Sequence, residues 1–145
     1  MGTEFVRRTL PAHIDALQEC FAFVREGARL SGLSDDDMNR LDLIMEEFFM
    51  NVARHAYPAG QSGDIELGYA VPAPGTLQVK ISDSGKMFNP LASSPPDFSR
   101  GVADRPLGGM GIFLVNEMAD SLSYSWLDNR NTISFTYPKS EPSGS

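Results

Sequence analysis

The sequence predicts an α+β fold, a two-layer α/β sandwich in which a mainly antiparallel sheet is covered on one face by helices. Two amphipathic helical stretches come early, within residues 11–57, whereas most of the later chain alternates apolar and polar residues as strands do. The later strands come in pairs joined by turn residues, which is typical of antiparallel hairpins. No run of alternating strands and helices supports a doubly wound parallel sheet.

The first half of the chain contains one predicted strand and two predicted helices. Residues 4–10 alternate loosely and indicate a short opening strand, and Pro11 suits the first turn of a helix that extends to about residue 30. Ser31-Gly32-Leu33 closes this helix. A second helix begins at Ser34, where Asp37 completes a capping box, and ends at Tyr57-Pro58-Ala59-Gly60. Its apolar stripe consists of Leu41, Ile44, Met45, Phe48 and Val52.

The second half changes to a period of two. Residues 65–69 and 77–81 indicate a hairpin around Pro72-Ala73-Pro74-Gly75, and residues 122–126 and 133–137 indicate another around Asp128-Asn129-Arg130-Asn131. Between the hairpins lie a long loop, residues 84–107, and a short apolar helix, residues 112–118; loops of this length are typical of functional lids or disordered segments. We expect one domain over residues 1–138 and a flexible tail over residues 139–145.

Composition restricts the classes of partner. At 145 residues the chain can bury a sizeable core as one domain. Its net charge is −7 and Lys and Arg form no stripe, which disfavours nucleic acid as a direct partner because phosphate binding needs concentrated positive charge. With no charged-then-apolar leader and no long apolar run, neither secretion nor membrane spanning is expected. The single cysteine, Cys20, lies in an apolar helical pattern and suits a cytoplasmic protein.

The second predicted helix carries a carboxylate and an amide on one face. Residues advance by about 100° along a helix, so relative to Glu47 the side chain of Asn51 lies at about 40° and that of Arg54 at about −20°. Glu46 points about 100° away. A carboxylate and a carboxamide oxygen one turn apart can serve Mg²⁺, or the carboxylate can take a proton from an attacking hydroxyl or water. The alternative is an ordinary solvated face, which is what an isolated E-x-x-x-N usually means.

Other residues with catalytic chemistry are few. His55 lies about 80° from Glu47 on the apolar side, and this pattern alone indicates a partly buried structural histidine. With His13 as the second histidine and one cysteine, no zinc-ligand spacing repeats. The same scarcity disfavours a Ser-His-Asp triad, and no G-x-S-x-G elbow is present.

Two further motifs follow the helix. Asp83 ends a predicted strand with Gly85 two residues later; the carboxylate can accept from an exocyclic amino group, and the glycine allows a flat base to approach closely. An ordinary Asp-Ser-Gly turn is the alternative. Gly108-Gly109-Met110-Gly111 leads directly into the helix that begins at Ile112, so successive N–H groups can converge on an anion. A flexible linker is the alternative here, and the run matches neither a Walker loop nor a Rossmann fingerprint.

Taken in order, these motifs resemble those of the Bergerat-fold (GHKL) ATPases, which include gyrase, histidine kinases and MutL. Closer still is the similarity to the anti-sigma-factor serine/threonine kinases of the RsbW type. The similarity covers roughly residues 5 to 138 and implies the Bergerat ATP-binding fold. The runs that carry it are Glu47-x-x-x-Asn51 with Arg54-His55-Ala56-Tyr57, Asp83-x-Gly85-x-x-Phe88-Asn89-Pro90, Gly108-Gly109-Met110-Gly111-Ile112-Phe113-Leu114-Val115, Ala119-Asp120, and Asp128-Asn129-Arg130-Asn131.

The resemblance implies a role for each motif residue. Glu47 is the catalytic base, and Asn51 coordinates the Mg²⁺ that bridges the phosphates of ATP. Asp83 binds the adenine amino group, Gly85 lets the base lie close, and residues 90–107 form the ATP lid. The other candidate nucleotide-binding residues are Arg54, His55, Phe88, Asn89, Pro90, Arg100, Arg105, Gly108, Gly109, Met110, Gly111 and Ile112. The sequence departs from many relatives at Lys86-Met87 and in its short lid, and both differences bear on nucleotide affinity or lid closure.

Three functions are compatible with these motifs. The first, implied by the resemblance, is an ATP-dependent kinase that phosphorylates a serine or threonine of an anti-anti-sigma antagonist and sequesters a sigma factor. The second is an ATP-gated binding module with little or no catalysis. The third, a detached histidine-kinase catalytic domain, ranks low because no phosphoacceptor-histidine hairpin is present. By family analogy the opening strand and first helix are candidates for a homodimer contact.

Overall fold

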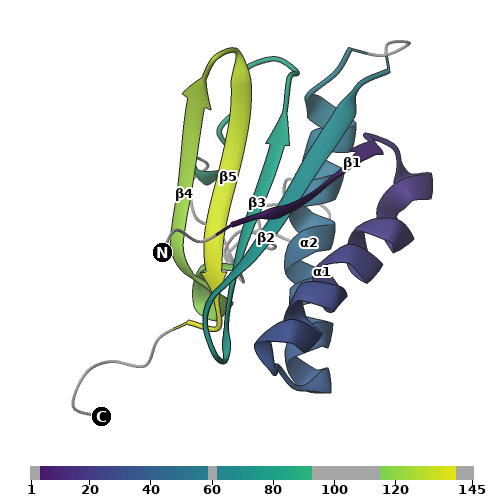
Figure 1. Cartoon of the computed structure of the whole chain (residues 1–145). Coiled ribbons are helices and arrows are strands. Elements are labelled where there is room, and N and C mark those ends of the chain that lie inside the picture. Colours follow the sequence, from purple (N-terminus) through teal and green to yellow (C-terminus); the bar gives the residue numbers. More distant parts are fainter. Residues whose placement is uncertain (1–3, 59–61, 93–114, 140–145) are drawn as a thin grey trace, which may run out of the picture.

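The computed structural model describes residues 4–58, 62–92 and 115–139 (Figure 1). Residues 115–118 are helical. In the part of the chain thus described, no helix is both long and apolar enough to cross a membrane. The other elements, in chain order, are β1 (Val6–Pro11), the 3₁₀ helix η1 (Ile14–Ala16), α1 (Leu17–Ser31), α2 (Asp35–His55), β2 (Asp64–Ala73), β3 (Thr76–Asp83), the 3₁₀ helix η2 (Pro90–Ala92), β4 (Asp120–Leu127) and β5 (Arg130–Tyr137).

The five strands form one antiparallel sheet, and the helices cover one of its faces. The strand order is β1-β2-β3-β5-β4, and every neighbouring pair is antiparallel. Figure 1 shows α1 and α2 side by side against the same face of the sheet. The predicted α+β fold is therefore confirmed. Because β3 and β5 are adjacent at the centre, the end of β3 and the start of β5 lie next to each other, with Asp83 opposite Asn131.

The core lies between the sheet and the two helices. Alternate residues of β2, β3 and β5 point toward the helices and are buried, as the period of two predicts. Hydroxyl pairs lie on the opposite face: Ser82 with Thr132 at 3.0 Å, and Ser123 with Ser134 at 2.8 Å. The largest fully buried side chains are Tyr137, Phe48, Phe49, Phe135, Leu41, Ile44, Met45, Ile65, Leu67, Leu77, Val24 and Val79.

The prediction that Pro11 begins a helix is wrong. Pro11 is the last residue of β1, paired with Asp64, at the end of an edge strand where a proline can be accommodated. The chain then turns at His13, whose Nδ1 accepts a hydrogen bond from the Asp15 backbone N–H at 3.0 Å, and α1 begins at Leu17. At its other end α1 stops where predicted, because Gly32 adopts a left-handed conformation with φ of 81°.

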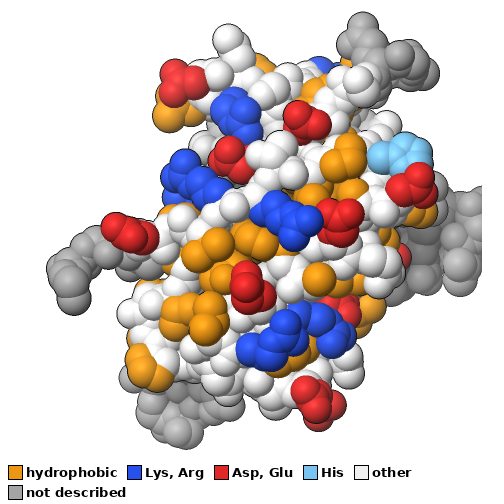
Figure 2. Space-filling model, turned by 45° about the vertical axis from the view of Figure 1, so that its right-hand side comes forward, with side chains coloured by type: hydrophobic (Ala, Val, Ile, Leu, Met, Phe, Trp, Pro, Cys, Tyr) orange, Lys and Arg blue, Asp and Glu red, His pale blue; other side chains and the backbone are white. Residues whose placement is uncertain are grey.

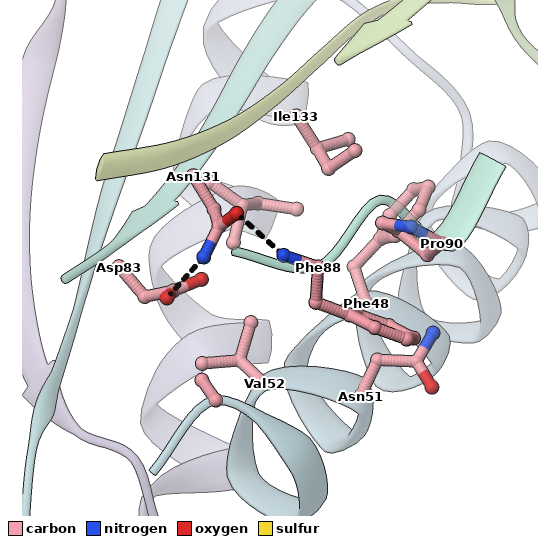
Figure 3. Close-up of a pocket in the computed structure, with 10 residues that line it drawn as sticks. Phe48, Asn51, Val52, Asp83, Phe88, Pro90, Asn131 and Ile133 are labelled. Atoms are coloured by element: carbon pink, nitrogen blue, oxygen red, sulfur yellow. Dashed lines mark hydrogen bonds between the residues drawn. The ribbon is translucent and has the colours of Figure 1, made fainter. Parts of the chain in front are cut away.

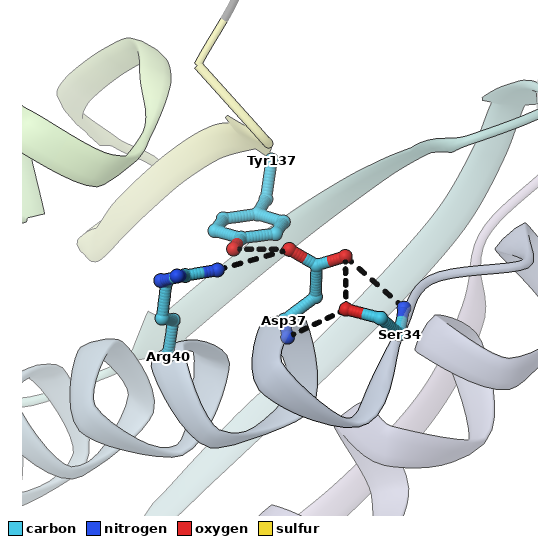
Figure 4. Close-up of polar contacts among 4 residues, drawn as sticks. All are labelled: Ser34, Asp37, Arg40 and Tyr137. Carbon is cyan, nitrogen blue, oxygen red and sulfur yellow. Dashed lines mark hydrogen bonds and ion pairs between the residues drawn. The ribbon is translucent and has the colours of Figure 1, made fainter.

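The predicted capping box at the start of α2 is present (Figure 4). Ser34 Oγ accepts from the Asp37 backbone N–H at 3.1 Å, and Asp37 Oδ2 accepts from the Ser34 N–H at 3.0 Å. The Tyr137 hydroxyl, from the last strand, donates to Asp37 Oδ1 at 2.8 Å, and Arg40 lies 3.5 Å from the same oxygen. The first turn of α2 is thus joined to the opposite end of the chain.

Both predicted hairpins form, with tighter turns than the sequence suggested. β2 extends to Ala73 through an irregular pairing after Ala70, so the first turn is reduced to Pro74 and Gly75. Asp128 and Asn129 make the second turn with φ of 56° and 62°, the conformation that a two-residue type I′ hairpin turn requires. Asn131 belongs to β5 and is buried, whereas the turn residues Asp128 and Asn129 are exposed.

Figure 2 shows the helical side of the molecule. Lys and Arg side chains alternate there with Asp and Glu, and apolar side chains lie between them. On this face the charges of the two signs are mixed, with no extended stripe of one sign.

Candidate functional site

A pocket opens where the second half of α2 meets the ends of β3 and β5 (Figure 3). Most of its wall is apolar, and three polar side chains face it from different elements: Asn51 from α2, Asp83 from β3 and Asn131 from β5. A mostly apolar cavity with a few placed polar groups is typical of a small-molecule site. The apolar residues are Phe48, Val52, Ala56, Ile81, Phe88, Pro90 and Ile133.

Asp83 lines this pocket and is 4% exposed. Its Oδ1 accepts two hydrogen bonds, from the Gly85 backbone N–H at 2.9 Å and from Asn131 Nδ2 at 2.9 Å. Among the described residues its other oxygen, Oδ2, has no hydrogen-bond partner. A carboxylate held in this way keeps one acceptor atom for a donor that enters the pocket.

Asn131 connects Asp83 to the segment that follows β3. Besides donating to Asp83, its Nδ2 donates to the Lys86 carbonyl at 2.8 Å. Its Oδ1 accepts from the Phe88 N–H at 3.0 Å and from the Tyr124 hydroxyl at 2.6 Å. In the sequence, Asn131 ends the turn motif Asp128-Asn129-Arg130-Asn131, and no role for it was predicted. The available signal was that it lies two residues before Ile133 and therefore faces the core side of β5.

Gly85 is required by packing against the end of α2. A Cβ atom at this position would collide with the backbone carbonyl of Ala56, and the Lys86 N–H donates to that carbonyl at 2.9 Å. Tyr57 adds a second connection, because its hydroxyl donates to the Asp64 carbonyl at 2.6 Å and accepts from the Ser84 N–H at 3.1 Å. These contacts hold the turn after β3 against the helix.

The two adjacent glutamates of α2 differ in environment. Glu46 is exposed, Glu47 is half-buried and Asn51 is 8% exposed. Glu47 Oε1 is buried and has no hydrogen-bond partner among the described residues. Burial raises the pKa of Glu47 above its ordinary value, and the charge of Glu46 adds to the rise, whereas the nearby Asn51 amide and the Arg54 charge act against it. A buried carboxylate oxygen without a donor is available to a proton or a cation.

The residues around the pocket mouth have mixed roles. His55 is exposed, so the prediction of a partly buried histidine is wrong; its ring lies against Phe88 with centroids 5.4 Å apart. Arg54 is also exposed, and it lies about two helical turns after Glu47 and less than one turn after Asn51. Asn89 Oδ1 accepts from the Leu91 N–H at 2.9 Å and so starts η2, while Pro90 lies in the pocket wall.

Several predicted nucleotide-binding residues lie outside the described part of the chain. Of the predicted lid, residues 90–107, the described part is η2. The predicted site residues outside the described ranges are Arg100, Arg105, Gly108, Gly109, Met110, Gly111 and Ile112. Downstream of them, Val115 is buried in the core and Ala119 is buried just before β4.

The two-layer sandwich and the pocket beside α2 fit the class of ATPase domains that the motifs resemble. A comparison with protein families agrees: residues 10–137 match the histidine kinase-like ATPase domain. The chain belongs to this family.

Two individual relatives of the chain are less than 30% identical to it over the matched residues. The chain is 28% identical over 99 residues to the "Serine-protein kinase RsbW" of Bacillus mycoides, covering 66% of this chain and 61% of that protein. It is 27% identical over 123 residues to the protein of the same name from Halalkalibacterium halodurans, covering 82% of this chain and 74% of that protein. The chain therefore spans less than two thirds of the length of the Bacillus relative.

Among solved structures, the RsbU and RsbW domains of a Mycobacterium tuberculosis protein share the fold. The TM-score is 0.60 at 21% identity, and the match covers 97% of this chain and 34% of the other. The resemblance to RsbW-type proteins is thus confirmed in both sequence and fold.

Proposed function

We propose that this chain binds ATP with Mg²⁺ in the pocket beside α2 and transfers the γ-phosphoryl group to a serine or threonine hydroxyl of a partner protein. The observation that carries the proposal is the unpartnered, buried Oε1 of Glu47, one helical turn before Asn51, which lines the pocket. Domain membership and the serine-protein kinase relatives support it.

The adenine end of the nucleotide is assigned to Asp83. Its free Oδ2 is the atom that accepts from the adenine amino group, and the apolar side chains of Val52, Ile81 and Ile133 cover the faces and edges of the base. A buried carboxylate with one free acceptor favours a base that presents an amino group over one that presents a carbonyl at the same place.

The phosphate end is assigned to Asn51 and to the predicted glycine run. The Asn51 carboxamide oxygen suits Mg²⁺, which prefers a few protein oxygens together with phosphates and water. When bound, Mg²⁺ supplies positive charge that offsets the charge of the phosphates. Arg54, Arg100, Arg105 and residues 108–112 are proposed phosphate contacts.

Glu47 is assigned the role of general base. As the seryl or threonyl oxygen bonds to the γ-phosphorus, the bond from that phosphorus to the bridging oxygen breaks, ADP leaves, and Glu47 takes the hydroxyl proton. Because burial raises its pKa, the Glu47 carboxylate binds this proton more strongly than an exposed carboxylate would.

The partners are proposed from the resemblance. They are an anti-anti-sigma antagonist of the STAS type as phosphoacceptor and a sigma factor as the sequestered protein, with no direct contact to nucleic acid or membrane. A cytoplasmic location and a homodimer belong to the same proposal.

The experiment compares Glu47→Gln with Glu46→Gln, a matched control on the exposed neighbouring residue. Each variant is incubated with labelled ATP, Mg²⁺ and candidate antagonists, and ATP affinity is measured by calorimetry. We expect Glu47→Gln to lower phosphate transfer by about 10²–10⁴-fold with ATP affinity retained, and Glu46→Gln to change neither.

Two results would contradict the proposal in different ways. Absence of ATP binding by the unmodified protein would overturn the nucleotide site itself. ATP binding without transfer, combined with partner binding that still depends on ATP, would assign the chain as an ATP-gated binding module instead.

A further inference from the structure

We propose that Asn131 is the positioning residue of the adenine site: it sets which oxygen of Asp83 is free and holds the 86–88 segment as the pocket wall, and Tyr124 holds Asn131 in turn. This inference rests on the proposed nucleotide site and concerns residues to which the resemblance assigned no role.

The amide of Asn131 has no unused hydrogen-bonding capacity. Its two N–H donors go to Asp83 Oδ1 and the Lys86 carbonyl, and its oxygen accepts from the Phe88 N–H and the Tyr124 hydroxyl, over distances of 2.6–3.0 Å. Figure 3 shows the bonds to Asp83 and Phe88. A primary amide has two donors and two acceptor positions, so all four are filled. Asn131 is 5% exposed. It therefore acts on a ligand through Asp83 and residues 86–88.

The orientation of this amide is determined by its neighbours. A backbone carbonyl such as that of Lys86 can only accept, and a backbone N–H such as that of Phe88 can only donate. The amide nitrogen must therefore face Lys86 and Asp83, and the amide oxygen must face Phe88 and Tyr124. A flipped amide would lose both backbone contacts, to the Lys86 carbonyl and to the Phe88 N–H.

The orientation of the Asn131 amide determines which carboxylate oxygen of Asp83 can accept a hydrogen bond from a ligand. Asn131 and the Gly85 N–H both occupy Oδ1, so the carboxylate can accept from a ligand only through Oδ2. Asp83 and Asn131 are directly paired across β3 and β5, whereas Phe88 is 43 residues from Asn131 in the sequence. The Asn131 side chain thus fixes the position of Asp83 relative to Phe88, and both of these residues line the pocket.

The main test is Asn131→Asp, which keeps the size of the side chain and removes both N–H donors. We expect affinity for MgATP to fall by about 10–100-fold, because two hydrogen bonds are lost and two carboxylates are placed side by side. The phosphate-transfer rate at saturating ATP should stay within about twofold, because the proposed general base, Glu47, has no hydrogen bond to Asn131 and is assigned to the phosphate end of the site. Amide hydrogen exchange in the nucleotide-free protein should accelerate at Gly85 and Phe88 and stay unchanged at Ile133.

Two further variants complete the design. Tyr124→Phe removes one hydrogen bond to Asn131 Oδ1 and should lower the affinity for MgATP by about 3–10-fold. This variant tests the inference independently if Asn131→Asp does not fold. Asn129→Gly, in the neighbouring turn with φ of 62°, is the matched control and should change neither affinity nor exchange.

Unchanged affinity together with unchanged exchange at Gly85 and Phe88 in folded Asn131→Asp would overturn the inference. The same conclusion would follow if Tyr124→Phe had no effect. Failure of the proposed function is separate: it would appear as absent ATP binding in the unmodified protein, whereas the exchange measurement needs no nucleotide.

Discussion

At the scale of single residues, Glu47 has a proposed catalytic role, and its burial carries a cost to the stability of the fold. Its Oε1 is buried without a partner, and burial raises its pKa. A carboxyl group whose pKa is higher in the folded chain than in the unfolded chain destabilises the fold once it is ionised. The cost is absent below the ordinary pKa of about 4.5 and grows as pH rises through the raised value.

We therefore expect Glu47→Gln to stabilise the fold at pH 7.5 by about 0.5–1 kcal/mol, because it removes the ionised carboxylate from this position. The gain should shrink as the pH approaches 4.5. Urea unfolding at a series of pH values measures it. Glu46→Gln, at the exposed neighbour, should have no comparable effect, and a loss of stability in Glu47→Gln at pH 7.5 would mean that the carboxylate is satisfied in the folded protein.

At two residues, Gly85 and Asn131, the structure shows contacts that the local sequence does not predict. Gly85 was predicted to allow close approach of a flat base, whereas the nearest atoms to a Cβ at this position belong to Ala56 at the end of α2. The period of two placed Asn131 on the inner face of β5, but no local pattern could pair it with Phe88. Contacts of this kind depend on how distant segments meet, which periodicity does not encode.

At the scale of elements, α2 positions both Glu47 and Asn51, so its start and direction matter to the site. Its beginning was predictable because the capping residues are local: Ser34 and Asp37 satisfy each other's backbone N–H groups. The start of α1 was not, because the pairing of Pro11 with Asp64 in β2 competes with helix formation and is a long-range contact.

For this cap we expect Ser34→Ala to lower the free energy of unfolding by about 1 kcal/mol, and Ser34→Gly to lower it by only a few tenths, because glycine is a tolerated N-cap residue. Thermal or urea unfolding measures both. Ser125→Ala, on an exposed position of β4, is the control and should stay within about 0.5 kcal/mol. Equal losses for the alanine and glycine variants would contradict a role specific to capping.

At the scale of the whole molecule, the order of the elements was easier to predict than the way they assemble around the pocket. Two hairpins and two helices in this order leave few compact arrangements other than a sheet covered on one face. The central pairing of β3 with β5 is what brings Asp83 and Asn131 together, and it joins segments about 50 residues apart. The motifs located the polar groups, while the sheet order determines which of them share a pocket.

A second contact between distant segments lies at the other end of β5, where the Tyr137 hydroxyl donates to Asp37, a residue 100 positions earlier in the sequence (Figure 4). Burial acts to raise the pKa of Asp37, but the hydrogen bonds from Tyr137 and Ser34, together with the Arg40 charge, lower it below its ordinary value of 3.8. A carboxyl group with a lowered pKa stabilises the fold above that ordinary value. Its contribution is lost as pH falls through the lowered pKa.

We expect Tyr137→Phe to reduce the free energy of unfolding by about 1–2 kcal/mol at pH 7, because a buried hydroxyl that donates to an ionised carboxylate is lost. The deficit should narrow as pH falls below 3.8, and the pKa of Asp37, followed by NMR, should rise in the variant. In a double-mutant cycle, Asp37→Asn should cost less in the Tyr137→Phe background than in the unmodified protein. Additive effects with an unchanged Asp37 pKa would show that the two ends of the chain are held together by packing alone.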